Sequence, residues 1–165
     1  KLQYLLPLLS PTDLNEYDLA VTGQEDNPEY AFYRLALKSA PDPQLTLTAY
    51  GHMAQLALDA LHRLAYEEEI FCDLLVPTQL APFELSPLFA SVRKTHRLLA
   101  VEEGTLSLGW GAEVLARTAE ALNSDLHKAV RLAAQETVIP AAPSLESACL
   151  PSTEDIIARV KEMVA

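Results

Sequence analysis

Residues 45–77, LTLTAYGHMAQLALDALHRLAYEEEIFCDLLVP, hold the pattern of a complete strand–helix–strand unit. Apolar and β-prone polar side chains alternate over residues 45–50, which predicts a strand that Gly51 ends. Apolar residues recur at three- and four-residue steps over residues 53–68, which predicts an amphipathic helix. The apolar run 70–76 before Pro77 predicts a second, buried strand.

The residues after this unit repeat the alternation of strand and helix. The predicted elements are helix 86–95, strand 97–101, helix 112–122, strand 129–134, a short helical segment at 144–150 and a terminal helix 153–165. Such alternation is typical of a parallel or mixed sheet with helices on both faces. The fold class that the sequence predicts is therefore α/β.

The first 44 residues differ from the rest in their proline content. They contain Pro7, Pro11, Pro28, Pro41 and Pro43, and proline interrupts regular elements. We interpret residues 1–44 as a connecting arm from an upstream domain and residues 45–165 as the folded domain. Within the arm, Asn27-Pro28-Glu29 has the residue order of a helix start, whereas residues 32–37 fit a strand equally well.

The composition excludes several classes of partner. Lys plus Arg is 12 and Asp plus Glu is 23, so the formal net charge is −11. A chain this acidic is not expected to bind nucleic acid or an anionic membrane, because both need a basic surface. The charge favours a basic partner or simple solubility. Apolar stretches are also shorter than the roughly 18–20 residues that span a bilayer.

The cysteines and the first residue suggest where the chain belongs. Cys72 and Cys149 do not make a disulfide framework, and Cys72 lies in an apolar run, where a thiol behaves as a small buried side chain. This cysteine usage fits a reducing, cytoplasmic location. The start lacks a signal peptide and begins with Lys1 rather than methionine. We therefore expect a piece of a longer polypeptide.

A glycine-spaced loop at residues 104–111 follows a predicted strand and precedes a predicted helix, where α/β folds often bind anions. The dinucleotide pattern would need a glycine where Val114 stands, and the acids Glu102 and Glu103 would repel a phosphate. The loop is interpreted as a packing or interface loop. The two acids, adjacent on a strand, point to opposite faces, so they do not form a catalytic pair. One of them could instead face a basic neighbour or cap a backbone donor.

Few residues qualify as catalytic groups. His52 follows the first strand of the unit and is the best single catalytic candidate by position. The four histidines lack zinc-site spacing, and nucleophile-elbow and Walker motifs do not occur. The sequence therefore equips this chain only weakly as an enzyme by itself.

Seven segments in order resemble one known family. They are LTAYGHM at 47–53, DLLVP at 73–77 with LSP at 85–87, VEEG at 101–104, GWGAEV at 109–114, VRLAA at 130–134, IPAA at 139–142, and LP at 150–151 with DII at 155–157. Together they make residues 45–165 similar to the transketolase C-terminal domain family, and most similar to the beta subunits of thiamine-diphosphate-dependent 2-oxo acid dehydrogenases.

The resemblance implies a three-layer α/β/α domain with a five-stranded, mostly parallel mixed sheet. It also implies that thiamine diphosphate and Mg²⁺ belong to other domains of the parent enzyme, so no cofactor or metal is expected here. The implied role is subunit association and docking of the acyltransferase core, whose subunit-binding domain is basic. The residues expected at this partner interface are Glu102, Glu103, Gly109, Trp110, Gly111, Asp125, Glu154 and Asp155.

Three alternatives stay open at this point. The chain could be a stand-alone, non-catalytic binding or regulatory module of the same fold. It could be the C-terminal domain of another transketolase-like enzyme. It could also be a small self-sufficient enzyme that uses His52 and a carboxylate.

Overall fold

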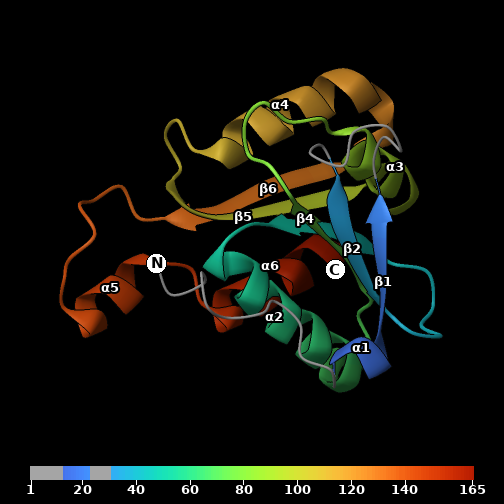
Figure 1. Ribbon diagram of the computed structural model, residues 1–165, viewed down its shortest axis with the longest axis horizontal. Helices are drawn as coiled ribbons and strands as arrows, with labels where there is room; N and C mark the ends of the chain where they lie inside the picture. Colours follow the sequence, from blue (N-terminus) through green and yellow to red (C-terminus); the bar gives the residue numbers. More distant parts are fainter. Residues whose placement is uncertain (1–12, 23–30) are drawn as a thin grey trace.

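A computed structural model describes residues 13–22 and 31–165 (Figure 1). The six strands of its single sheet are β1 (Tyr17–Thr22), β2 (Phe32–Leu37), β3 (Leu45–Ala49), β4 (Cys72–Pro77), β5 (Arg97–Thr105) and β6 (Lys128–Ala134). The α-helices are α1 (Asp13–Glu16), α2 (His52–Glu68), α3 (Ser86–Thr95), α4 (Trp110–Leu122), α5 (Pro143–Cys149) and α6 (Thr153–Val164). A 3₁₀ turn, η3 (Asn123–Asp125), joins α4 to β6.

The sheet is mixed and mostly parallel, in the order β1-β2-β4-β3-β5-β6. Strand β3 pairs in parallel with β4 and β5, and β5 pairs in parallel with β6. The hairpin of β1 and β2 joins antiparallel to β4. The predicted fold class is confirmed, but among the described residues the sheet has six strands rather than five, because β1 extends it beyond β2.

Helices cover both faces of the sheet, as the three-layer prediction requires (Figure 1). Helices α2 and α6 pack on one face, where Leu61 and Ile156 belong to the larger apolar core. Helices α3 and α4 pack on the other face with Leu88 and Val114. Every residue of β3 is buried, as expected for a central strand covered on both sides. No helix in residues 13–22 and 31–165 is long and apolar enough to cross a membrane.

Residues of the predicted arm take part in this sheet. Residues 32–37 form β2. Of the two structures that the sequence allowed for this segment, the strand is therefore the one that forms. The guanidinium of Arg34 donates from Nε and Nη2 to the carboxylate of Asp73 on β4, at 3.0 and 2.6 Å. The helix start proposed at 27–29 lies outside the described residues. The domain boundary at residue 45 stays a prediction. Strand β2, which precedes this boundary in the sequence, pairs with β4 of the sheet.

Several element boundaries differ from those predicted. Helix α3 has the predicted bounds, whereas α4 begins at Trp110 instead of residue 112. Strand β5 continues through Thr105 instead of ending at residue 101, because it keeps pairing with β6 across an irregularity between Val101 and Thr105. That irregularity lies in the segment that carries the predicted acidic pair, and bulges often redirect side chains near functional sites.

Candidate functional site

The carboxylate of Glu102 lies completely buried at the carboxyl end of β5. Its Oε1 accepts a hydrogen bond from the backbone N–H of Gly111 at 3.0 Å, and the N–H of Trp110 also acts on it. These N–H groups belong to the first turn of α4, which has no backbone partners for them within the helix. Glu102 thus serves as the anion at the positive end of this helix.

The three glycines of the 104–111 loop surround this carboxylate. A Cβ built on Gly104 or Gly111 would lie 3.0 or 2.7 Å from an oxygen of Glu102. A Cβ on Gly109 would lie 2.6 Å from Oε2 and would also collide with the carbonyl oxygen of Thr105. The predicted packing or interface loop thus packs its glycines against the chain's own carboxylate, where nucleotide-binding folds hold a phosphate.

The expectation that Glu102 lies on an acidic surface is wrong, since no part of the residue is exposed. The alternative, that one of the two acids caps backbone donors, is confirmed for Glu102 by the bond from Gly111. Glu103 remains partly exposed, and its charge acts on Tyr50. Gly111 lies at the junction of loop and helix, and its free face meets side chains of Glu102, Ala100 and Arg131.

Burial dominates the electrostatics of the loop. It raises the pKa of Glu102 by removing the carboxylate from water, while the two amides and Arg131 lower this pKa by less. The Oε2 atom has no hydrogen-bond partner among the described residues. Burial, and then the nearby Glu102 and Glu103, raise the pKa of Tyr50. The thiol of Cys72 has its pKa raised to about 12 by burial and by Asp73, so it is an unreactive core group, as the sequence predicted.

Replacing Glu102 with glutamine is expected to change how stability depends on pH. Because the pKa of Glu102 is raised in the folded chain, the folded state binds this proton more tightly than the unfolded chain. The stability of the natural chain therefore falls relative to that of Glu102→Gln as pH rises from the ordinary glutamate pKa, about 4.3, through the raised folded value. Chemical unfolding of both chains at several pH values measures the difference, and a constant difference would contradict the expectation.

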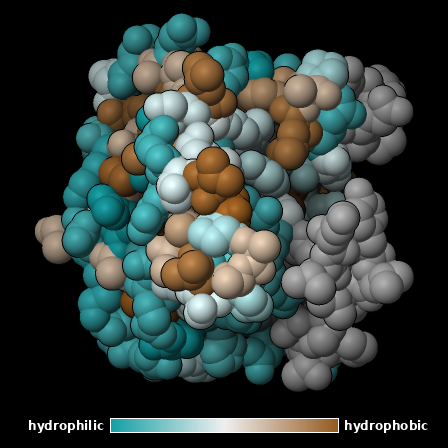
Figure 2. Space-filling view, turned by 90° about the vertical axis from the view of Figure 1, so that its left-hand side faces the viewer, coloured by the Kyte–Doolittle hydropathy of each residue, from teal (hydrophilic) through white to brown (hydrophobic). Residues whose placement is uncertain are grey.

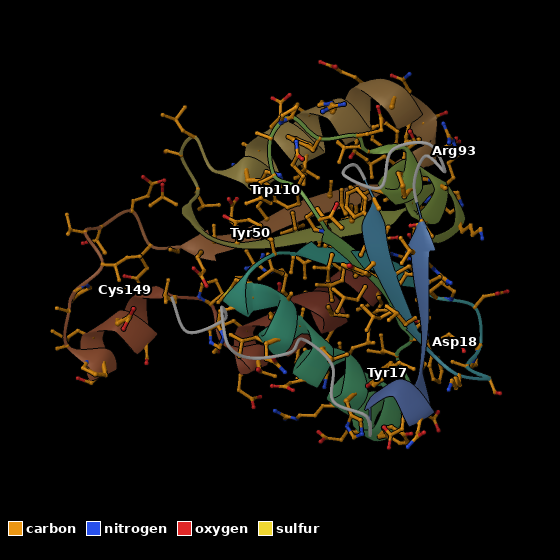
Figure 3. All side chains as sticks on the ribbon, in the orientation of Figure 1. Tyr17, Asp18, Tyr50, Arg93, Trp110 and Cys149 are labelled. Carbon is orange, nitrogen blue, oxygen red and sulfur yellow. The ribbon has the colours of Figure 1, made fainter. Side chains whose placement is uncertain are left out.

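An aromatic cluster lies beside the loop, where α2 and α4 leave β3 and β5 toward opposite faces of the sheet. Trp110 packs edge-on against Tyr50 with ring centroids 5.2 Å apart (Figure 3). The ring centroids of Trp110 and Phe83 are 6.0 Å apart. The guanidinium carbon of Arg117 lies 4.9 Å from the centroid of the Phe83 ring. Open α/β sheets commonly bind ligands at such a switch point. Here aromatic side chains and Glu102 occupy it.

His52 begins α2 and borders a cavity of about 360 Å³. Met53, Leu56, Leu150 and Pro151 give this cavity an apolar lining. Glu154 also lines it, but its carboxylate is bound by Arg63 instead of His52. The geometry therefore lends the histidine–carboxylate hypothesis no support.

The structure separates the other residues predicted at the partner interface. Glu154 is paired with Arg63, and Asp155 caps α6 by accepting hydrogen bonds from the Ser152 backbone and hydroxyl. Asp125 lies at the amino end of β5 and β6, where its carbonyl contacts His96. Glu103 lies at the carboxyl end of β5, about 20 Å away along the strand. These acids do not form one continuous surface.

A buried polar network escaped the sequence analysis. Asp73, whose side chain is 2% exposed, also accepts a hydrogen bond from the Ser91 hydroxyl at 2.9 Å. Thr46 joins the hydroxyls of Ser91 and Thr95, each at 2.8 Å. An aspartate inside an otherwise apolar predicted strand was the available signal, since buried charges are normally paired. The network ties β2, β3, β4 and α3 together.

The described residues do not fit a diphosphate with its metal. The helix N-terminus after β5 already holds the Glu102 carboxylate. Within residues 13–22 and 31–165, no three His, Cys, Asp or Glu side chains gather closely enough to hold a metal ion. The described residues therefore hold a carboxylate of the chain itself at the position where such folds hold a phosphate.

Comparison with known proteins supplies the family. The family model of the transketolase C-terminal domain matches residues 35–156. The beta-1 subunit of the mitochondrial pyruvate dehydrogenase E1 component of Arabidopsis thaliana is 37% identical over 114 residues, which are 68% of this chain and 31% of that protein. The corresponding beta subunit of Porphyra purpurea is 33% identical over 163 residues, which are 94% of this chain and 48% of that protein.

The chain thus spans about a third to a half of the length of these curated relatives. Its fold is also that of a split gene transketolase, solved as an inactive beta4 tetramer, with a TM-score of 0.63 at 23% identity over 76% of this chain and 40% of the other. The resemblance read from the ordered motifs is confirmed. The chain belongs to the transketolase C-terminal domain family.

Proposed function

We propose that this chain is the C-terminal assembly domain of the decarboxylating component of a thiamine-diphosphate-dependent 2-oxo acid dehydrogenase. Its parent is a beta subunit or a fused chain that binds thiamine diphosphate and Mg²⁺ on other domains. In this role the domain associates with other subunits and docks the basic subunit-binding domain of the acyltransferase core. Its compartment is cytoplasmic, as the sequence led us to expect, or mitochondrial, as in the names of several relatives.

One observation carries the proposal beyond the family likeness. The position at which an α/β domain of this topology holds an anionic ligand is filled by Glu102 of the chain itself. The domain is therefore built as a scaffold, with its ligand position closed. The similarity to pyruvate dehydrogenase E1 beta subunits supports the dehydrogenase context, and the charge of −11 supports a basic partner.

Docking is tested by titrating the chain with a purified subunit-binding domain of a pyruvate dehydrogenase acyltransferase at low and at physiological ionic strength. Binding is expected, and weaker at the higher salt, because charges at an interface rim act through screened long-range attraction. Joint reversal of Glu103 and Glu146 to lysine is expected to weaken binding about tenfold or more at low salt. Glu146 lies exposed on α5, at the same end of the sheet as Glu103.

Asp125→Lys is the matched control, because Asp125 is exposed at the opposite end of the sheet. Asp125→Lys changes the charge at its position by as much as each of the two glutamate reversals does. It is expected to weaken binding only slightly. Thermal unfolding of each variant checks that the fold is intact. Affinity that ignores both the salt and the Glu103 and Glu146 reversals would remove the acidic docking role. Tight binding of thiamine diphosphate by this chain alone would contradict the assignment of the cofactor to other domains.

A further inference from the structure

Large apolar side chains are exposed on two segments at the carboxyl end of the sheet. Leu106 and Leu108 lie in the loop between β5 and α4, and Val138, Ile139 and Leu145 lie between β6 and the middle of α5. Leu108 is completely exposed, and Val138 is 88% exposed. We call these five residues the anchor face. Figure 2 shows this side of the molecule, where brown apolar side chains stand among teal polar ones.

Hydrogen bonds hold the loop that carries Leu106 and Leu108. The Thr105 hydroxyl donates to the Ser107 carbonyl at 3.0 Å, and Arg131 binds the Leu106 carbonyl. The backbone N–H of Ser107 donates to Glu136 at 2.7 Å, which joins this loop to the segment of Val138. Behind the loop, the glycines close on Glu102. A rigid loop loses little conformational entropy when a partner binds it.

Leu108 also has an unfavourable backbone conformation. Its φ is 60°, in the left-handed region that costs an L-residue with a Cβ free energy and that glycine or asparagine tolerates better. Burial of its side chain within the chain does not compensate, since the side chain is completely exposed. Strain combined with an exposed apolar side chain is typical of a binding site.

The charge around the anchor face selects the kind of partner. Residues 98–116 and 132–158 contain no Lys or Arg. Apart from the ion-paired Glu154 and the helix-capping Asp155, the acids of these segments that are at least partly exposed are Glu103, Glu113, Glu136 and Glu146. The nearest cation of the loop, Arg131, is engaged with the Leu106 carbonyl. A second copy of the chain would bring another net charge of −11 against this face, which opposes association.

We propose that the anchor face binds a basic protein partner and that Leu108 inserts into an apolar pocket of that partner. Glu102 is the positioning residue that holds the loop in its binding conformation. This inference rests on the proposed function and deepens it, because it assigns the docking of the basic acyltransferase domain to Leu106, Leu108 and Val138. Acids at the rim supply the long-range attraction and Leu108 supplies the central buried contact.

The test replaces Leu108 with asparagine and measures both stability and binding. Leu108→Asn is expected to raise the melting temperature by about 2–4 °C, because asparagine tolerates the left-handed backbone better. The same change is expected to weaken binding of the purified acyltransferase subunit-binding domain about tenfold or more. Val21→Thr is the matched control, since Val21 is an exposed apolar residue on β1 and threonine keeps its branched shape. It is expected to leave binding unchanged.

The outcomes separate the surface from the function. Binding that is lost in Leu108→Asn and kept in Val21→Thr supports the anchor face. Binding that is equal in both variants and in the natural chain overturns the anchor face and leaves the docking function standing. Failure of the natural chain to bind this domain at low salt overturns both. Self-association that Leu108→Asn abolishes identifies a second copy as the occupant and overturns the basic partner.

Discussion

Arg34→Ala is expected to lower the free energy of unfolding by about 3 kcal/mol, at the lower end of the range for breaking a buried ion pair. The change leaves the carboxylate of Asp73 buried without its two charged hydrogen bonds, and among the described residues the Ser91 hydroxyl is the one donor left to it. The effect stays at the lower end because the Arg34 side chain is 34% exposed, so water can reach part of the gap. Chemical unfolding at neutral pH measures it.

The double variant Arg34→Ala with Asp73→Asn provides the control for this prediction. Asparagine removes the buried charge and keeps an acceptor for Ser91, so the double variant is expected to be more stable than Arg34→Ala alone. Arg63→Ala, which removes an exposed ion pair with Glu154, is expected to change stability far less. If Arg34→Ala proved as mild as Arg63→Ala, β2 would not depend on this pair for its place in the sheet.

Gly109→Val is expected to lower the free energy of unfolding by about 3 kcal/mol. A Cβ at this position collides with the Thr105 carbonyl and lies 2.6 and 2.7 Å from the two Glu102 oxygens. Backbone cannot move aside as a side chain can, so the loop and the first turn of α4 must shift. For a chain of this size the melting temperature should fall by about 6–12 °C.

Two neighbouring glycines show whether Glu102 is the cause. The new Cβ of Gly104→Ala comes closer than ordinary contact to the end of the Glu102 side chain, at 3.0 Å, and lies at ordinary contact distance from the Gly109 backbone. This change is expected to cost clearly less than Gly109→Val. Gly111→Ala meets Glu102 Oε1 at 2.7 Å, so its cost should shrink in a chain that already carries Glu102→Ala. The cost of Gly109→Val should persist there, because Thr105 still obstructs it. If Gly111→Ala cost the same with and without Glu102, Gly111 would not be required by the Glu102 carboxylate.

The local elements of this protein were predictable because their patterns are local. Helix α3 begins at the Ser86-Pro87 pair and ends near Thr95 as predicted. Residues 45–49 form a strand whose neighbours along the chain supply its helix and its parallel partner. Periodicity, caps and the alternation of strands with helices were sufficient for the fold class. The ordered motifs then led to the family.

The arm shows what short patterns could not decide. Residues 32–37 fit two structures equally well, and pairing with β4 decided between them. That pairing joins Arg34 to Asp73 across 39 positions of sequence, and no local pattern reports such a contact. The neighbouring β1 was missed for the same reason, since β2 supplies its pairing partner. A strand that is defined by its neighbours needs those neighbours in place.

Glu102 and the anchor face show which features follow from the sequence alone and which depend on the tertiary structure. The sequence by itself determined the α/β class, the family, the acidic charge and a glycine loop whose spacing is wrong for a dinucleotide. Tertiary structure decided that Glu102 turns inward under α4, while Glu103 beside it stays partly exposed. It also brought residues 104–109 and 135–139 together through Ser107 and Glu136. Charge and periodicity are properties of the chain, whereas burial and neighbourhood arise only when distant segments pack.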